Sequence, residues 1–339
     1  MFATAVPGLA RLAGRELETL DGVRVTGYGF DGRSDVVLLD VDRGRRRQLR
    51  SVRTIEDLFA EVGRTLRTDG DRPHWIASRT WQPERVQRAL SIWAEEAGPL
   101  TPAITFRVIA RVLQETSFLR TDLRRELAAA VSRDKRKWSI ADPARLEVWI
   151  SEYAPGRLVA GIRLSDASMR QHRGRVTERS GALRPTVAAA MVGLAGPAGG
   201  LLLDPCCGSG TILAEALAAG WEAEGRDADP AAMDVSRRNV PAAAVKVGDA
   251  RRLDLAGASV GACVSNLPFG QQYDVQGEMG QWLAAVLAET ARVTRPGGRV
   301  ILLAPQLPRS VVPAQLRMRE RHQIRLLGTK TTIWAYDRA

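Results

Sequence analysis

The sequence predicts an α/β fold, and three observations in its second half carry that prediction. From residue 200 onward, short apolar stretches typical of buried strands alternate with helical patterns, an order that favours a parallel sheet. Leu201–Thr211 has the pattern of one such strand, followed by a glycine-containing turn and the start of a helix. Asp204, Asp227, Asp249 and Asn266 end four successive predicted strands. Open α/β sheets bind their ligands at that edge, so we expect a binding site there.

Residues 1–70 are predicted to form a small α+β domain of their own. Strands are expected over Phe2–Val6, Val23–Phe30 and Asp35–Val41, with a helix after the first of them. The apolar residues of Ile55–Val62 are assigned to a short helix. Thr68–Pro73 is polar and contains glycine and proline, and it is the expected domain boundary.

Residues 71–165 are predicted to form a second small domain with the order α–β–α–β–β. The helices are expected over Glu84–Ala97 and Asp122–Val131. The strands are expected over Ile104–Val112, Leu146–Ser151 and Leu158–Leu164. Arginines lie on these elements, a combination that suits a domain that binds RNA.

Residues 166–184 are polar and basic and are expected to link this domain to the one that follows, residues 185–339. Pro185 fits the first position of a helix that runs to Ala195. Five strand–helix units and a terminal hairpin are then expected, which is the order of a Rossmann-like domain. After Leu201–Leu203 the predicted strands are Glu222–Arg226, Ala244–Val247, Ala262–Ser265, Arg299–Leu303, Ile324–Leu327 and Thr332–Tyr336.

The net charge of +11 over 339 residues favours a polyanionic partner, and nucleic acid before a membrane. A generally arginine-rich composition would also produce this charge. The six arginines of Arg43–Arg53 could contact phosphates, and a solvated loop fits them equally well. Three cysteines give neither a disulfide framework nor a metal-ligand spacing. The sequence shows no signal peptide or membrane span, so we expect a soluble, cytoplasmic protein. We also expect a monomer that binds no metal.

The loop Asp-Pro-Cys-Cys-Gly-Ser-Gly-Thr after the first strand decides which cofactor fits. A dinucleotide would require Gly-x-Gly-x-x-Gly, whose amides hold a pyrophosphate. Asp204 at the start of this loop would repel a pyrophosphate and attract a cation. Asp227 follows 23 residues later, about where an acid accepts hydrogen bonds from ribose hydroxyls.

This loop resembles motif I of RNA and DNA amino-methyltransferases, whose cofactor is S-adenosyl-L-methionine. The resemblance implies that Asp204, Gly208 and Gly210 surround the methionine part of the cofactor. It also implies Asp227 on the ribose and Asp249 beside the adenine amino group. The remaining expected cofactor-binding residues are Pro205, Cys206, Ser209, Thr211, Ala228, Ala250 and Asn266.

Ser265–Gly270 is similar to the (Asp/Asn)-Pro-Pro-(Tyr/Phe) motif of enzymes that methylate exocyclic amines, with Leu267 at the first proline position. The lone pair of such an amine is delocalised, so it is a weak nucleophile. The Asn266 side-chain oxygen and the Leu267 carbonyl can accept its two N–H bonds, and alignment with the methyl donor then favours transfer. Pro268 stiffens the turn, and Phe269 can stack on the base. The expected catalytic residues are therefore Asn266, Pro268 and Phe269.

The cysteines suggest a different reaction, covalent attack on C5 of a pyrimidine. Cys206 and Cys207 precede the predicted cofactor helix and are expected to lie away from the Asn266 turn, so we reject this reading. Cys263 falls inside a predicted strand and is expected to be a small buried residue.

Phe106–Val108, Phe118–Leu127, Trp138–Ile140, Leu146–Ile150 and Gly161–Ser165 together resemble a THUMP domain. THUMP domains follow a ferredoxin-like domain in several RNA-modifying enzymes, which implies that fold for residues 1–70. With the sequence Asn-Leu-Pro-Phe at its catalytic motif, the chain is similar to THUMP-containing tRNA guanine-N2-methyltransferases. Within that family, this variant of the motif implies guanosine 6 of the acceptor stem as the methylated nucleotide. The expected RNA-binding residues are Arg107, Arg111, Arg124, Arg170 and Arg173.

Three other readings stay open at this point. The same chemistry could act on 23S rRNA or on guanosine 10 of tRNA. A chain with a vestigial cofactor fold could bind RNA without catalysis, although the intact series of polar strand ends argues against that reading. A DNA adenine methyltransferase fits less well, because the first half resembles an RNA-binding domain.

Overall fold

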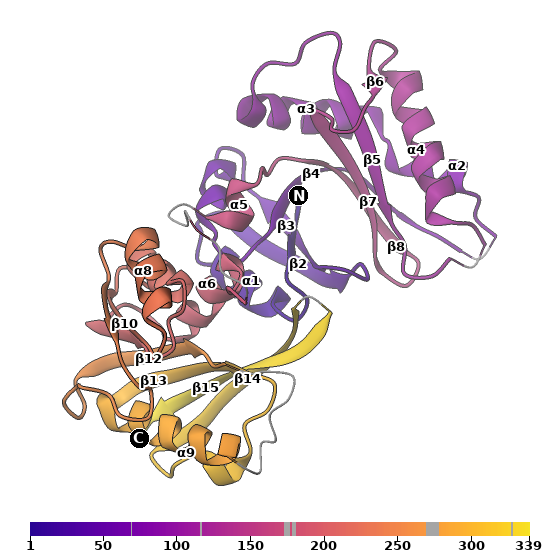
Figure 1. Ribbon diagram of the computed structural model, residues 1–339. Coiled ribbons are helices and arrows are strands. Elements are labelled where there is room, and N and C mark those ends of the chain that lie inside the picture. Colours follow the sequence, from indigo (N-terminus) through magenta and orange to yellow (C-terminus); the bar gives the residue numbers. More distant parts are fainter. Residues whose placement is uncertain (69, 116, 173–176, 178–180, 269–277, 327) are drawn as a thin grey trace. The chain divides into compact units, whose positions relative to one another are not determined.

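The computed structural model describes residues 1–339 except 69, 116, 173–176, 178–180, 269–277 and 327 (Figure 1). The chain divides into two compact units, Met1–Met169 and Arg170–Ala339. None of the helices in the described parts is both long and apolar enough to cross a membrane.

The first unit contains one eight-stranded sheet with the strand order β2-β3-β1-β4-β8-β7-β5-β6. Neighbouring strands are antiparallel except where β5 lies between β6 and β7, which run parallel to it. The strands are β1 Phe2–Ala5, β2 Val23–Phe30, β3 Asp35–Val41, β4 Asp57–Leu66, β5 Thr105–Arg111, β6 Ser139–Ile140, β7 Leu146–Ala154 and β8 Arg157–Arg163. The helices are α1 Ala10–Leu17, α2 Pro73–Thr80, α3 Pro83–Ala97 and α4 Arg120–Asp134, with a 3₁₀ turn over Arg46–Ser51.

The helix predicted over Ile55–Val62 is wrong, because this stretch belongs to β4. Strand β4 lies between β1 and β8, and Asp57, Leu58, Phe59 and Ala60 are all buried. A strand covered on both faces carries a continuous apolar run, and a short buried helix can carry the same run. Through β4 the sheet continues from residues 1–70 into residues 71–165, and the domain boundary at residue 70 stays a prediction.

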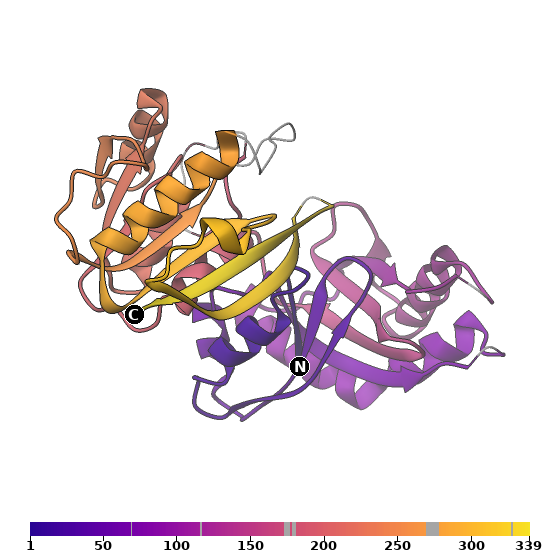
Figure 2. The same ribbon diagram turned by 90° about the horizontal axis from the view of Figure 1, so that it is seen from below.

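The second unit contains a seven-stranded sheet with the order β11-β10-β9-β12-β13-β15-β14. Strands β9 to β13 are parallel, and β15 and β14 form the antiparallel terminal hairpin. Helices α6 and α8 lie on one face of the sheet and α9 on the other (Figures 1 and 2). The strands are β9 Leu201–Asp204, β10 Glu222–Asp227, β11 Ala244–Val247, β12 Val260–Asn266, β13 Thr294–Ala304, β14 Leu316–Leu326 and β15 Thr329–Arg338. The helices are α5 Ser168–Gln171, which spans the boundary between the units, α6 Pro185–Leu194, α7 Thr211–Ala218, α8 Pro230–Asn239 and α9 Glu278–Val293, with a 3₁₀ turn over Arg309–Val311.

Strand order reverses between β9 and β12, and this reversal positions the site. The chain passes from β9 to β10 and β11 on one side, then returns to β12 and β13 on the other. In open α/β sheets the crevice at such a switch point receives the ligand. The core below it includes Leu203, Cys263, Leu287 and Val300, all fully buried. The predicted α/β class and Rossmann-like order are confirmed.

Candidate active site

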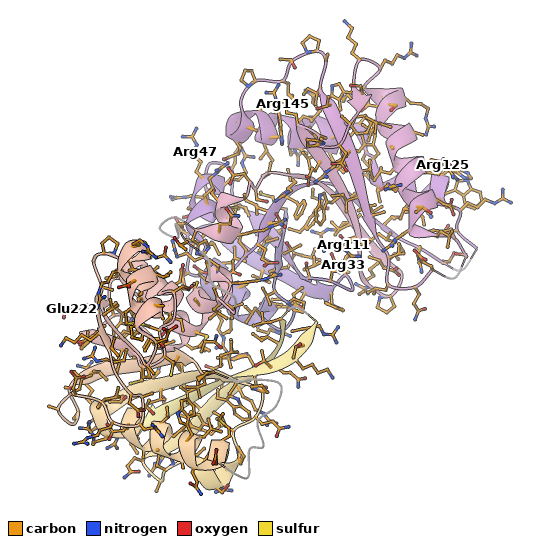
Figure 3. The ribbon with its side chains drawn as sticks, viewed as in Figure 1. Arg33, Arg47, Arg111, Arg125, Arg145 and Glu222 are labelled. Atoms are coloured by element: carbon orange, nitrogen blue, oxygen red, sulfur yellow. The ribbon has the colours of Figure 1, made fainter. Side chains whose placement is uncertain are left out.

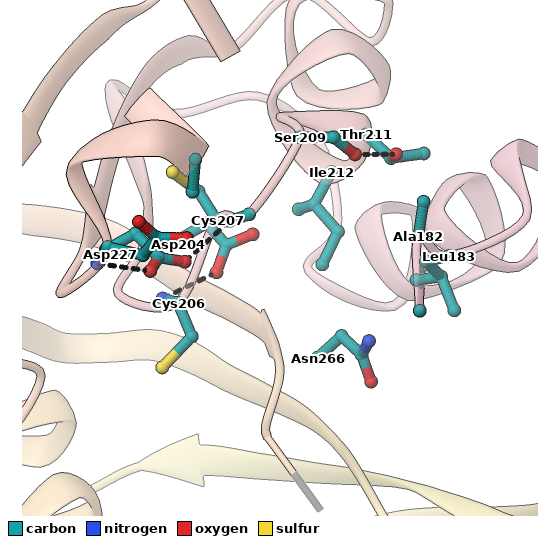
Figure 4. Close-up of a pocket in the computed structure, with 14 residues that line it drawn as sticks. Ala182, Leu183, Asp204, Cys206, Cys207, Ser209, Thr211, Ile212, Asp227 and Asn266 are labelled. Atoms are coloured by element: carbon teal, nitrogen blue, oxygen red, sulfur yellow. Dashed lines mark hydrogen bonds between the residues drawn. The ribbon is translucent and has the colours of Figure 1, made fainter. Parts of the chain in front are cut away.

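Two adjoining cavities lie at the carboxyl ends of β9, β10 and β12. The smaller holds about 220 Å³ and contains the loop after β9, together with Gly181, Ala182 and Leu183. The larger holds about 1000 Å³ and extends over Ala228 and Asp249 to helix α9. Cys206, Asp227 and Asn266 line both cavities, so the two form a continuous site. Figure 4 shows the smaller cavity, with Ala182 and Leu183 across from Asp204 and Cys206.

Backbone hydrogen bonds hold the loop after β9 against β10. The Cys207 N–H donates to the Arg226 carbonyl at 2.8 Å, and the Gly208 N–H donates to Asp227 Oδ2 at 2.9 Å. Gly210 begins α7 with φ +83°, a conformation that side chains rarely adopt. A Cβ atom there would also lie 2.6 Å from Ser236 Oγ. Gly210 therefore shapes the loop from beneath instead of lining either of these two cavities.

Asp204 is a buried acid at the base of the smaller cavity, with 1% of its surface exposed. Its Oδ1 accepts hydrogen bonds from Ser265 Oγ at 2.7 Å and from the Cys206 N–H at 3.1 Å. Burial, together with a smaller contribution from the nearby charge of Asp227, raises the pKa of Asp204 to about 7. A cation bound in the cavity would favour its ionised form.

Asp227 ends β10, Asp229 follows it, and the two complete the acidic wall. Asp227 Oδ1 accepts the Asp229 N–H at 3.0 Å, while its Oδ2 holds the loop. Asp229 caps α8 by accepting the Ala231 N–H at 2.9 Å, as a residue before proline is expected to do. No lysine or arginine is among the described residues that line the smaller cavity. The cavity therefore fits a cationic group.

Asp249 lies at the far end of the larger cavity, beyond β11. Arg251 pairs with it at 2.7 Å, and the hydrogen bonds of Arg251 lower the pKa of Asp249. Asp249 is therefore ionised at neutral pH, and its carboxylate already has a partner.

Asn266 ends β12 at the junction of the two cavities and is half-buried. The Leu267 N–H donates to the Leu303 carbonyl at 3.2 Å, which continues the sheet pairing one residue past the strand. Within the described residues, the Asn266 amide makes no hydrogen bond. Pro268 lines the larger cavity beside Met279 and Trp282 of α9. Phe269 lies outside the described residues.

Every predicted cofactor residue except Gly210 lines one of these two cavities. The sequence reasoning missed Gly181, Ala182 and Leu183 in the smaller cavity and Met279 and Trp282 in the larger. Gly181, Ala182, Met279 and Trp282 belong to no motif. Leu183 lies two residues before Pro185, the first residue of α6. The proline predicts where the helix begins, but it does not indicate what the residues before it contact.

The expectation that Cys206 lies away from the Asn266 turn is wrong, because both residues line the same two cavities. The protonation of the three thiols nevertheless argues against nucleophilic chemistry. Burial raises the thiol pKa values of Cys206 and Cys207 well above the usual value, and that of Cys263 to about 12. Thiolates are the reactive form, so these thiols are unreactive at neutral pH. Cys263 is fully buried, as predicted. No group of metal-ligating side chains occurs within the described ranges.

Two of the predicted RNA-binding arginines of the first unit are held by carboxylates. Arg107 Nε donates to Glu147 at 3.0 Å, and its Nη1 donates to Asp142 at 2.6 Å. Arg111, labelled in Figure 3, pairs with the buried Asp31 at 2.8 Å and stacks over Trp149 at 4.5 Å. These contacts stabilise the sheet, and a role for either arginine in RNA binding stays a prediction.

Arg124 is exposed on α4 and lines a cavity of about 550 Å³ that also contains Arg33, Arg111 and Arg120. Arg170 is exposed in α5. Arg173 lies outside the described residues. In the Arg43–Arg53 run, Arg46 pairs with Glu95 and Arg50 with Glu96, both on α3. Carboxylates thus already neutralise part of that run.

Residues 172–327 match the family model UPF0020, described as the RMKL-like methyltransferase domain. The chain is thus similar to that domain over 156 of its 339 residues. The match includes both cavities' strand-end residues, from Asp204 to Asn266.

Two of three curated relatives align over more of the chain than this match does. The tRNA (guanine(10)-N2)-dimethyltransferase of Methanothermobacter thermautotrophicus is 26% identical over 236 residues, which are 67% of this chain and 66% of that protein. The tRNA (guanine(6)-N(2))-methyltransferase THUMP3 of Bos taurus is 29% identical over 62% of this chain and 45% of its own. The U6 snRNA (guanine-N(2))-methyltransferase THUMPD2 of Bos taurus is 34% identical over 37% of this chain and 26% of its own. The chain thus spans two thirds or less of these relatives.

Among solved structures, TrmN from Thermus thermophilus superposes with a TM-score of 0.79 over 100% of this chain and 99% of its own, at 22% identity. The putative methyltransferase SMU.472, solved with SAH, gives a TM-score of 0.66 over 100% and 97%, at 14% identity. These likenesses establish the fold of both units.

Proposed function

We propose that this chain is an S-adenosyl-L-methionine-dependent enzyme that methylates the exocyclic N2 amine of a guanosine in tRNA. The observation that carries the proposal is the position of Asn266. It joins an acidic cavity, suited to a cationic cofactor, to a larger cavity open to a base. All three relatives named above carry guanine-N2-methyltransferase names.

The two cavities suit both the charged methionine end and the nucleoside end of the cofactor. Asp204 and Asp229 line the space for its ammonium and sulfonium charges, and Asp227 lines both cavities where the ribose would begin. Ala228, Asp249 and Ala250 line the space for its ribose and adenine. When bound, the cofactor supplies an activated methyl group on a positively charged sulfur.

The residues of the chain would prepare the acceptor amine. The Asn266 side-chain oxygen and the Leu267 carbonyl accept its two N–H bonds and turn the nitrogen lone pair toward the methyl group. Leu267 is fixed for this role because its N–H pairs with β13 and its side chain is 2% exposed. Asparagine is a weak base, so the proton leaves to water after transfer. Alignment therefore provides most of the rate enhancement.

We further propose guanosine 6 of the acceptor stem as the target, the position named for the THUMP3 relative. A paired base there must leave its stack to reach Asn266. Residues 71–165 would act as a THUMP domain that holds the 3′ end at a fixed distance. Guanosine 10 is the second candidate, because the archaeal relative that aligns over 236 residues is named for it. We propose a monomeric, cytoplasmic enzyme that uses no metal.

Mass spectrometry of nucleosides tests this function. Unmodified tRNA transcripts are incubated with the protein and the cofactor, and modified fragments are mapped after nuclease digestion. We expect N2-methylguanosine at position 6. Methylation at position 10 would select the second candidate, and methylation of another atom or none at all would refute the function.

A further inference from the structure

The segment predicted as an interdomain linker, residues 166–184, belongs from Arg170 onward to the second unit. Two buried contacts attach it there. The first is made by Asn239, the last residue of α8, which is 5% exposed. The second is made by His172, whose side chain is 7% exposed.

Asn239 bonds to the segment and to the cofactor loop at once. Its Oδ1 accepts the Thr177 N–H at 2.9 Å, and its Nδ2 donates to the Thr177 carbonyl at 3.0 Å. The same Nδ2 donates to the Ser209 carbonyl at 3.0 Å. Ser209 precedes Gly210, so the amide joins the segment to the loop that shapes the smaller cavity.

His172 attaches the start of the segment to the helix that follows this loop. Its Nδ1 lies 2.8 Å from Glu215 Oε1, and Glu215 is a buried residue of α7 with 2% exposure. The backbone of His172 has φ +49°, in the left-handed region that residues other than glycine adopt uncommonly. The segment is thus bonded to both helices that flank the loop.

The end of the segment forms one wall of the smaller cavity. Gly181, Ala182 and Leu183 line it opposite Asp204 and Cys206 (Figure 4). Leu183 is 7% exposed and leads directly into α6.

We propose that Asn239 is a positioning residue that couples the docking of this segment to cofactor binding. This inference rests on the proposed cofactor site. Linkage requires the coupling to act in both directions: if docking strengthens cofactor binding, bound cofactor must protect the segment from opening by the same factor. A purely structural asparagine would produce no such reciprocity.

Asn239→Asp and Asn239→Ala test the coupling in the full-length protein. The aspartate loses both Nδ2 bonds and places a carboxylate against two carbonyl oxygens. The Thr177 and Ser209 carbonyls then lack their donor, and we expect the cofactor Kd to rise roughly tenfold or more. Arg238→Ala, an exposed neighbour on the same helix, is the matched control and should leave the affinity unchanged.

Two readouts are compared, the cofactor Kd by calorimetry and the rate at which trypsin cleaves the arginine-rich segment 170–184. For wild type, we expect added S-adenosyl-L-methionine to slow cleavage. For both Asn239 variants, we expect a higher Kd and a smaller protection, with kcat near normal at saturating cofactor.

Thr177→Pro removes the N–H from the segment side and leaves α8 unchanged, which keeps the test valid if the Asn239 variants misfold. It should raise the Kd in the same way. Wild-type affinity and protection in Thr177→Pro, or in both folded Asn239 variants, would overturn the coupling while leaving the proposed function intact. Absence of cofactor binding by the wild type would instead refute the function.

Discussion

The ionisation of Asp204 makes cofactor affinity depend on pH in a predictable direction. Burial raises the pKa of this acid to about 7, while Ser265 and the Cys206 N–H partly oppose the shift. A bound ammonium group favours the carboxylate, so binding releases a proton from the protonated fraction. At pH 6 about one molecule in ten carries the carboxylate, and the association constant should be about tenfold below its plateau, or about 1.4 kcal/mol.

Calorimetry in buffers of different ionisation enthalpy measures this release. We expect about half a proton near pH 7, falling toward zero by pH 8, from the fractional ionisation of one group. The amine of the cofactor loses its own charge near pH 8, so the comparison is made below pH 7.5. Asp204→Asn is the control: it should bind more weakly and lose the dependence between pH 6 and 7.5. Equal wild-type affinity at pH 6 and pH 7.5 would refute the reasoning.

Four further predictions concern stability, catalysis and RNA binding. Burial raises the pKa of Asp204 from 3.8 to about 7 in the folded state, so the protonated acid stabilises the fold fully below about pH 4 and this stabilisation is lost as the pH rises through 7. Without cofactor, Asp204→Asn should therefore have a higher Tm than wild type at pH 8. Asn266→Ala should lower kcat at least 100-fold with the cofactor Kd unchanged, because an oriented hydrogen-bond partner is lost; a near-normal rate would exclude its role. Arg111→Ala removes the ion-pair partner of the buried Asp31, which keeps its hydrogen bonds from the Arg33 and Ser34 N–H groups, and should cost about 3 kcal/mol of unfolding free energy by urea titration. Arg124→Ala should keep that free energy and weaken tRNA binding in a filter assay. Residues 170–339 alone should bind the cofactor and fail to methylate tRNA, and site-specific methylation by that fragment would exclude a measuring role for the first unit.

The sequence predicted most of the second unit because its signals are local. Strand, glycine turn and helix follow one another within Leu201–Thr211, and parallel strands bring their carboxyl ends to one edge. Asp204, Asp227 and Asn266 therefore meet as expected. The helix assigned to Ile55–Val62 was wrong because a strand buried on both faces has no alternation to read.

What the sequence could not predict depends on distant partners. Arg107 and Arg111 resembled free RNA contacts, yet their carboxylates lie 35 to 80 residues away in the chain. Gly181 and Ala182 of the cavity wall belong to no motif, and the hydrogen bonds between Thr177 and Asn239 join residues 62 positions apart. Such pairings become visible only when the fold places them together.

Replacement of one nucleotide tests the proposed acceptor atom most directly. Inosine differs from guanosine by the absence of the N2 amine, so a tRNA with inosine at position 6 keeps the remaining contacts. Methyl transfer from labelled cofactor is measured for this tRNA and for its guanosine 6 counterpart. We predict transfer to the guanosine tRNA and none to the inosine tRNA, and equal labelling of the two would contradict methylation of N2 at this position.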